Sequence, residues 1–417
     1  MFALVIALTV SAGPTFIEDD YARALKVAKA KKKLLVVDAW APWCHTCIFM
    51  REHVLNQPAF APFEKDVVFA AIDTEKPKSA AFLEKFPVNV WPTLFFIDPA
   101  TETVRYRWLG TADVVQMTSL LEAARQRSGP AGEADALFAT GDAAGAAERY
   151  LAARKMDATA GRDTVALVTA LWAAKQYPLC TQTAIDETPR LASAPDKAAV
   201  VSWGMTCVTS LPAGPERDAA QATLVKLTRD VMKLDGLLAD DVSSLSSQLV
   251  DERRAAKDDE GVRVLGGAWW LFLSEVATKA PTPAARAVFD AHRVQAAIAA
   301  GHPESMVEPL QRSEREFPKD YNPPARLALT YRAMKQWPEA HAAIDRALKR
   351  CVGPRKLGLY ETKASLFERQ GDVVKQRATL EAAVAYAATL PKAQRSEDHV
   401  AHLKATAEAL RDAPTAR

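Results

Sequence analysis

The 417-residue sequence lacks a hydrophobic run long enough to cross a bilayer. Its apolar stretches Phe2 to Val10 and Leu265 to Leu273 hold nine residues each, whereas a spanning helix needs about 20. The sequence also lacks an excess of charge, because 53 Lys and Arg residues nearly match 51 Asp and Glu residues. The resulting net charge of +2 provides no electrostatic footprint for nucleic acid or an anionic membrane. We therefore expect no membrane span and no nucleic-acid partner.

The sequence contains few cysteines, and their number is odd. The five cysteines comprise one close pair, Cys44 and Cys47, and three scattered residues, Cys180, Cys207 and Cys351. No second CxxC motif is present, so the second knuckle that usually completes a structural zinc site is missing. An oxidising compartment would tolerate this set, although a cysteine count does not establish one.

The composition that is present, 49% hydrophobic and 25% charged, is that of a globular protein. Single cores usually stop growing near about 250 to 300 residues, so we expect at least two domains. MFALVIALTVSAGP predicts a signal peptide over residues 1–13, with cleavage after Ala12 or Gly13. The positively charged residues that usually begin a signal peptide are absent. The true start therefore lies upstream of Met1, or the apolar run is a buried N-terminal strand. We expect export to the periplasm or cell envelope, and a cytoplasmic location if the run is not a signal.

Residues 16–127 predict an α/β domain. LLVVDAW, VVFAAID and TLFFID are short apolar runs followed by polar or turn-forming residues, as buried central strands are. The hydrophobic period alternates between them, which predicts the order helix, strand, helix, strand, helix, strand, strand, helix. The segment Asp98 to Glu102 predicts the hairpin turn that leads into the last strand, TVRYRWLG.

Residues 133–411 predict an all-α region after a linker at 128–132, because the chain becomes alanine-rich and is broken by GD, YP, LP, DG, FP and WP. Three predicted helix pairs place small, large and turn residues at repeated offsets: Ala134, Leu137, Gly141, Ala146, Tyr150 and Ala153; Ala328, Tyr331, Ala340, Ile344 and Ala347; Ala364, Phe367, Gly371, Leu380 and Ala383. These offsets resemble the tetratricopeptide repeat (TPR) family, which implies a curved solenoid that binds a protein or peptide. The alternative is a generic alanine-rich helical bundle.

Cys44 and Cys47, in WAPWCHTC, could bind a metal, form an inert crosslink or exchange electrons. Zinc would need two more ligands, and the nearby candidates are only His45, inside the pair, and His53. An inert disulfide across so short a loop would remove little entropy from the unfolded chain.

The placement of the pair favours electron exchange. A strand over residues 34–40 is predicted to end before Cys44, and a helix to begin near His45, where free N–H groups and the helix dipole stabilise a thiolate. Cys44 is therefore the predicted nucleophile. Cys47, one turn further and shielded, is the predicted resolving cysteine.

The segment DAWAPWCHTC resembles the active site of the thioredoxin family, within an α/β pattern that matches this fold over residues 16–127. The expected fold class is thus an α/β thioredoxin-like N-terminal domain followed by an all-α TPR-like helical repeat domain. The resemblance places the family's buried acid on Asp38, which would accept a proton when Cys47 attacks. From its position alone, Asp38 could instead be a capping or loop-anchoring residue. Trp40 and Trp43 match the family's flanking tryptophans, with plain packing as the alternative.

The family's cis-proline falls on Pro92 in NVWPTLFFID. A trans proline that starts the strand is the alternative. In the family, the residue before this proline offers backbone groups to an extended substrate. That residue is Trp91 here, which is bulkier than expected and leaves substrate preference open. Trp43 and Trp91 are the predicted substrate-binding residues.

The longer segment KKKLLVVDAWAPWCHTCIFMREHVLNQPAF is most similar to thioredoxin-like domains of bacterial envelope proteins, including the periplasmic domain of transmembrane thiol-disulfide interchange proteins. This similarity favours export. The dipeptide His45-Thr46 differs from those of reducing thioredoxins and of strong oxidants. A protonated His45 would lower the pKa of Cys44, and its alternative role is an exposed polar residue.

We predict an exported thiol-disulfide oxidoreductase, with reductase or isomerase activity favoured, that acts on protein thiols or disulfides without a cofactor or metal. Its helical repeats would recruit a protein partner or substrate. The alternative is a TPR-type scaffold in which the thioredoxin fold is a docking module. If the protein is exported, Cys180 and Cys207, in helical segments on either side of a loop, predict a structural disulfide, with two buried free thiols as the alternative. Cys351 is expected to be free.

Overall fold

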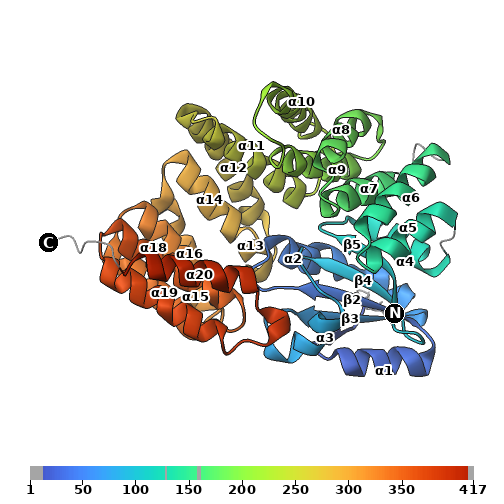
Figure 1. Cartoon of the computed structure of the whole chain (residues 1–417), viewed down its shortest axis with the longest axis horizontal. Coiled ribbons are helices and arrows are strands. Elements are labelled where there is room, and N and C mark those ends of the chain that lie inside the picture. The colour runs from blue at the N-terminus through green and yellow to red at the C-terminus, as the bar shows by residue number, and fades with distance from the viewer. Residues whose placement is uncertain (1–12, 127–128, 157–160, 412–417) are drawn as a thin grey trace, which may run out of the picture.

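The computed structural model describes residues 13–126, 129–156 and 161–411. Except for Gly13, the predicted signal peptide at 1–13 lies outside these residues. In the described part of the chain, no helix is both long enough and apolar enough to cross a membrane. Figure 1 shows an α/β half, in blue, and a helical half that runs from green to red.

The α/β half is built on a five-stranded mixed sheet with the order β1-β3-β2-β4-β5. β2 and β3 are parallel, with Leu34 beside Val67, and almost entirely buried. Because both of their faces are covered, they are the continuous apolar runs that the sequence shows. β4 is antiparallel to β2 and forms the predicted hairpin with β5. The strands are β1 (Phe16–Glu18), β2 (Leu34–Trp40), β3 (Val67–Asp73), β4 (Thr93–Asp98) and β5 (Thr103–Leu109).

Helices cover both faces of this sheet. α1 and α3 pack on one face, where Ala28 and Phe82 join the cluster around Val37 and Phe95. The other face packs against α4 and the segment after α2. The helices are α1 (Tyr21–Lys31), α2 (His45–Phe49), α3 (Ala80–Lys85) and α4 (Val114–Gln126), with a π-helical turn (Met50–Leu55) and 3₁₀ segments at Pro58–Lys65 and Pro77–Ser79.

The second half is all-α in its described residues, as predicted. Its helices are α5 (Gly129–Ala139), α6 (Ala143–Met156), α7 (Gly161–Ala173), α8 (Tyr177–Glu187), α9 (Ala194–Val208), α10 (Pro215–Val231), α11 (Ala239–Ala255), α12 (Asp259–Lys279), α13 (Pro283–Ala287), α14 (Asp290–Ala300), α15 (Val307–Glu316), α16 (Asn322–Ala333), α17 (Trp337–Arg350), α18 (Arg355–Arg369), α19 (Val373–Ala387) and α20 (Glu397–Ala409). Short 3₁₀ segments lie at Thr188–Arg190, Pro303–Met306 and Lys392–Gln394.

The three predicted TPR-like units are the antiparallel pairs α5/α6, α16/α17 and α18/α19. The small residues of the pattern lie where the helices meet: Ala134, Ala146, Ala328 and Ala340 are fully buried. Alanine permits this close approach because it adds only one carbon to each helix surface. The TPR-like architecture is therefore confirmed.

The predicted linker at 128–132 is wrong for residues 129–132, which form the first turn of α5. Pro130 suggested a break in the chain, but the first turn of a helix tolerates proline because its N–H groups have no partner within the helix. α5 contacts β5, and the guanidinium of Arg107 on β5 lies 4.5 Å from the ring centre of Phe138 on α5. The two halves are thus in direct contact where they join.

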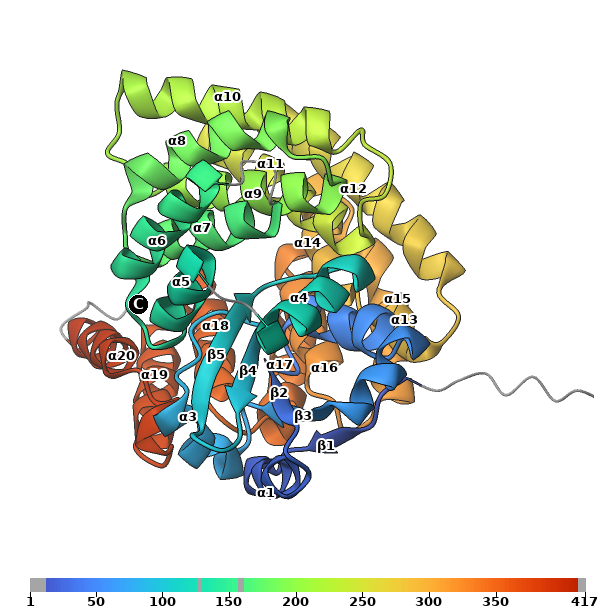
Figure 2. The same cartoon turned by 90° about the vertical axis from the view of Figure 1, so that its right-hand side faces the viewer.

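The helical half forms an arc around the α/β half (Figure 1 and Figure 2). The arc begins at α5 against β5, and near its end the 3₁₀ segment Lys392–Gln394 contacts α3. One apolar cluster continues from Phe96 and Trp108 of the sheet to Phe138 and Leu167 of the helical half. α2 lies on the side that faces the inside of the arc (Figure 1). The chain segment that carries the CxxC motif is therefore enclosed by both halves.

Candidate functional site

The Cys44 and Cys47 pair lies where β2 leads into α2. A turn closed by Cys44 N–H to the Ala41 carbonyl, 3.1 Å, follows the strand. Cys44 is the N-cap of α2, and its Sγ accepts a hydrogen bond of 3.0 Å from the Cys47 N–H. The two cysteines are joined by a disulfide, with their Cα atoms 5.2 Å apart. The predicted helix start near His45 is confirmed.

Both cysteines are buried. Cys47 is fully buried, as predicted, and Cys44 is only 5% exposed. They form a small cluster with Ala41, against which Trp40, Trp43 and Trp91 pack. In the closed arrangement that the structure shows, a bulky protein surface cannot lie flat against Cys44.

Asp38 lies inside β2 and is 1% exposed. Neither carboxyl oxygen has a hydrogen-bond partner in the described part of the chain, and Arg51 Nη1 lies 3.8 Å from Oδ2. Burial raises the pKa of Asp38 to about 7, against the opposing charge of Arg51. Asp38 can therefore exchange a proton near neutral pH, which is the property that the predicted role requires.

The Trp91-Pro92 peptide bond is cis. Pro92 precedes β4, and the Trp91 indole N–H donates to Thr74 Oγ1 at 2.9 Å. Trp43 contacts Trp91 edge-on, with ring centres 5.1 Å apart, and its indole N–H donates to Glu75 Oε1 at 2.8 Å. The structure thus brings both predicted substrate-binding tryptophans to the redox pair.

The helical half holds the loops around the pair at several points. Asn322 Nδ2 donates to the Pro42 carbonyl at 3.0 Å. The backbone N–H of Arg355, at the start of α18, donates to Glu75 Oε2 at 2.7 Å. Gln394 Nε2 donates to the Thr74 carbonyl at 2.7 Å. These contacts come from residues that follow the α/β half by some 200 residues or more, so no local motif could have identified them.

The helical half also contacts His45, inside the CxxC motif. His45 Nδ1 lies 2.7 Å from Asp240 Oδ1 on α11, and the imidazole stacks on that of His292 on α14. The alternative in which His45 is an exposed polar residue is wrong, because its exposed fraction is 7%. Sequence reasoning missed Asp240 and His292, which no motif links to residues 44–47.

No metal site is apparent in residues 13–126, 129–156 and 161–411, which contain no cluster of three or more His, Cys, Asp or Glu side chains placed to hold an ion. The two candidate extra ligands lie in other surroundings. His45 pairs with Asp240, and His53 packs on the ring of Phe49 with ring centres 4.8 Å apart.

Cys180 on α8 and Cys207 on α9 are joined by a disulfide, with Cα atoms 6.1 Å apart. This bridge lies in the helical half and ties neighbouring helices. Cys351 is a buried free cysteine.

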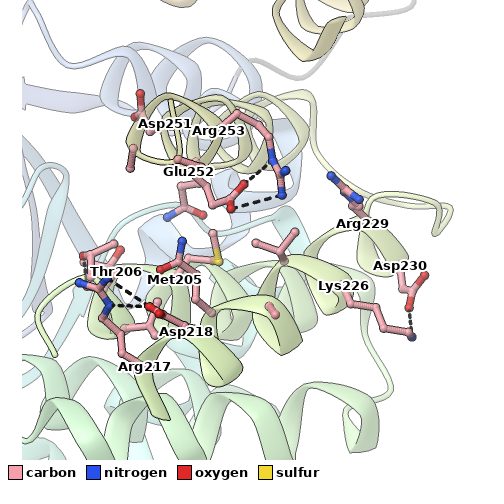
Figure 3. Close-up of a pocket in the computed structure, with 18 of the residues that line it drawn as sticks. Met205, Thr206, Arg217, Asp218, Lys226, Arg229, Asp230, Asp251, Glu252 and Arg253 are labelled. Carbon is pink, nitrogen blue, oxygen red and sulfur yellow. Dashed lines mark hydrogen bonds and ion pairs between the residues drawn. The ribbon is translucent and has the colours of Figure 1, made fainter. Parts of the chain in front are cut away.

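A cavity of about 150 Å³ lies beside the pair, where Thr46 and Trp91 face Trp203 and Leu245 of the helical half. A groove of about 1050 Å³ lies between α9, α10 and α11, away from the predicted catalytic residues. Figure 3 shows that its wall carries charges of both signs, many of them already in ion pairs with neighbouring side chains.

The fold and the paired cysteines define a thioredoxin-like domain joined to a TPR-like helical region. Residues 16–99 match the family described as thioredoxin-like. Thioredoxin H3 of Arabidopsis thaliana is 37% identical over 82 residues, which are 19% of this chain and 63% of that protein. A thioredoxin H-type of Oryza sativa subsp. indica is 31% identical over 88 residues, 20% of this chain and 66% of that protein. The chain therefore spans somewhat less than two thirds of these relatives.

Two solved structures are similar to parts of the chain. A candidate disulphide-isomerase from Bacteroides thetaiotaomicron is 28% identical and covers 28% of this chain and 98% of its own, with a TM-score of 0.26. A tetratricopeptide repeat protein from Parabacteroides merdae is 9% identical and covers 67% of this chain and 97% of its own, with a TM-score of 0.45. The resemblance predicted from DAWAPWCHTC is confirmed by the family match.

Proposed function

We propose that the protein is a thiol-disulfide oxidoreductase that acts on protein thiols or disulfides through Cys44 and Cys47. One observation carries this proposal: the pair lies at the N-terminus of α2, in a domain that also holds a cis Pro92 and a buried Asp38 whose oxygens have no hydrogen-bond partner among the described residues. A domain used only for docking would need none of these features. They count against the alternative of a TPR-type scaffold.

In the reducing direction, the Cys44 thiolate attacks one sulfur of a substrate disulfide and releases the other sulfur as a thiolate. Cys47 then gives up its proton and attacks Cys44 Sγ. This second step forms the Cys44–Cys47 disulfide and releases the second substrate thiolate. Two electrons pass from the pair to the substrate, and the oxidising direction is the exact reverse.

Asp38 is the proposed proton acceptor in the second step. A group with a pKa of about 7 can accept the Cys47 proton and return it to solvent at neutral pH. The first attack needs no such acceptor, because the N–H groups at the start of α2 already stabilise a Cys44 thiolate. We keep reductase or isomerase activity as the favoured direction.

The helical half is the proposed recruiting domain for a protein or peptide partner. The groove of about 1050 Å³ between α9, α10 and α11 supports this proposal, because the charged side chains of its wall can hydrogen-bond the backbone of a bound segment (Figure 3). We also propose export to the periplasm or cell envelope. The apolar start of the sequence and the Cys180–Cys207 disulfide support this location, because structural disulfides persist in oxidising compartments.

The test is dithiothreitol-driven reduction of insulin and of glutathione disulfide. The wild-type protein is expected to exceed the uncatalysed rate, and Cys44→Ser to give only that rate. Cys351→Ser is the matched control, since it removes a buried thiol outside the pair and is expected to keep wild-type activity. A wild-type rate equal to the uncatalysed rate with both substrates would favour the scaffold.

A further inference from the structure

The side chain of His45 lies in a buried polar network built mostly by the helical half. Asp240 Oδ2 accepts a hydrogen bond of 2.9 Å from Thr111 Oγ1, and its Oδ1 faces His45 Nδ1 at 2.7 Å. His292 stacks on His45, with ring centres 4.0 Å apart, and its Nδ1 lies 2.6 Å from Ser243 Oγ. The network joins the CxxC motif through the backbone, because His45 directly follows Cys44 in the chain.

The network places one negative charge beside His45. Burial alone would raise the pKa of Asp240, but the His45 imidazole, the nearby His292 and the Thr111 hydrogen bond hold it below its usual value. Asp240 is therefore a carboxylate at neutral pH, although only 1% of it is exposed. A buried carboxylate needs a partner of opposite charge.

His45 is the direct partner of Asp240, and His292 stacks on His45. Burial and the neighbouring His45 lower the pKa of His292 to about 3, so His292 is neutral at pH 7. A contact of 2.7 Å between an imidazole nitrogen and a carboxylate oxygen requires a proton on that nitrogen. The proton therefore belongs on His45 Nδ1, where Asp240 attracts it.

We propose that Asp240 is a positioning residue for the redox pair: it orients the His45 imidazole and, by its negative charge, favours the cationic form of that imidazole and with it the reduced pair, in which Cys44 is a thiolate. The proposal rests on the thiol-disulfide exchange proposed above. The reduced pair has a negative charge on Cys44 that the disulfide lacks, so a nearby cation stabilises the reduced form and makes the pair more oxidising. The helical half thereby tunes the chemistry of a cysteine that it does not contain.

The test is the equilibrium of the pair with reduced and oxidised glutathione at pH 7. Asp240→Asn keeps the shape of the side chain and removes its charge. We expect the equilibrium to shift about tenfold toward the Cys44–Cys47 disulfide, which is about 30 mV for a two-electron couple. Asp259→Asn is the matched control, because Asp259 lies on the neighbouring α12, is exposed, and should leave the equilibrium unchanged.

A double-mutant cycle separates this effect from a loss of packing. His45→Gln alone is expected to shift the equilibrium in the same direction, and Asp240→Asn to add nothing in that background. If Asp240→Asn does not fold, His45→Gln still tests the proposal. An unchanged equilibrium in His45→Gln, or a full Asp240→Asn shift that persists without His45, would overturn it. The proposed function fails separately, by a lack of catalysis in the wild-type protein, because the equilibrium is measured on the pair itself.

Discussion

Two buried aspartates near the redox pair have opposite electrostatic properties. Asp38 and Asp240 are each 1% exposed. Burial raises the pKa of Asp38 to about 7, because its oxygens have no hydrogen-bond partner in the described residues and Arg51 is 3.8 Å away. Burial acts on Asp240 too, but His45 and Thr111 hold its pKa below the usual value. Residue type and burial alone therefore do not determine the pKa of a buried aspartate. The groups that contact its carboxyl oxygens determine it.

Replacing Asp38 by asparagine should slow the step in which Cys47 resolves the mixed disulfide. Asparagine cannot accept the Cys47 proton, so we expect that step to slow on the order of 100-fold near neutral pH. The first attack by Cys44 should change little. Stopped-flow mixing of the reduced protein with a chromogenic disulfide measures both steps, and equal resolution rates in the two proteins would refute the role of Asp38.

The same variant should change how stability depends on pH. The folded-state pKa of Asp38 is raised from 3.8 to about 7, so folding favours the protonated acid. The stabilisation that this gives is complete below about pH 4 and is lost as pH rises through 7. The advantage of Asp38→Asn over wild type should therefore grow by about 3 kcal/mol between pH 5 and pH 8. Urea unfolding of both oxidised proteins at pH 5 and pH 8 measures this difference in the free energy of unfolding. A difference that is the same at both pH values would contradict the raised pKa.

Asp38 and Pro92 are assigned through the resemblance of DAWAPWCHTC and NVWPTLFFID to the thioredoxin family, and the cysteines through their close spacing and their place between a strand and a helix. Asp38 stands six residues before Cys44, and Pro92 directly precedes a strand. Asp240 and His292 could not be predicted, because their approach to His45 depends on how the arc of helices curves. That curvature results from many small helix contacts, and no short pattern of residues records it.

At the scale of elements, the spacing of alanines and the position of apolar runs predict most of the helices and strands. β2 and β3 are predicted because strands buried on both faces need unbroken apolar sequence. The helix pairs are predicted because close helix contacts need small residues at fixed offsets. The start of α5 was missed because glycine and proline occur both in linkers and in the first turn of a helix.

The disulfide between α8 and α9 should stabilise the helical half. It closes a loop with a sequence separation of 27, and loop entropy then predicts a contribution of about 3 to 4 kcal/mol. Cys180→Ala with Cys207→Ala should lower the free energy of unfolding by that order, while Cys351→Ala changes only local packing. Mass spectrometry after alkylation without reduction should leave Cys180 and Cys207 unlabelled. Labelling of both in the untreated protein would refute the bridge.

At the scale of the whole molecule, the arc and the α/β half act as one unit. The apolar cluster shared by Trp108 and Phe138 joins them on one side, and the contact of Arg355 with Glu75 joins them on the other. A truncated α/β half would expose part of this core, so removing the helices does not cleanly test their role. A variant of the full chain in which one contact between the halves is loosened does test the role of the helices.

Gly353, just before α18, is the point at which such a variant can act. Its φ is +77°, and a Cβ there would overlap the Glu75 carbonyl oxygen. Gly371 has a similar φ of +73°, but a Cβ there would meet nothing within 4 Å. Gly353→Ala and Gly371→Ala therefore introduce comparable backbone strain, and only Gly353→Ala pushes the helical half away from the redox loops.

If the helical half limits access to Cys44, the wild-type protein should reduce a small disulfide far better than a folded protein disulfide. A weakening of the closed arrangement by about 1.4 kcal/mol would raise the open population about tenfold. We therefore expect Gly353→Ala to raise the rate of insulin reduction relative to that of glutathione disulfide, and Gly371→Ala to leave this ratio at its wild-type value. Because both rates are measured on one enzyme preparation, a partly unfolded sample lowers them together and does not change the ratio. An equal ratio in all three proteins would mean that the arc positions the residues around the pair without restricting which disulfides reach it.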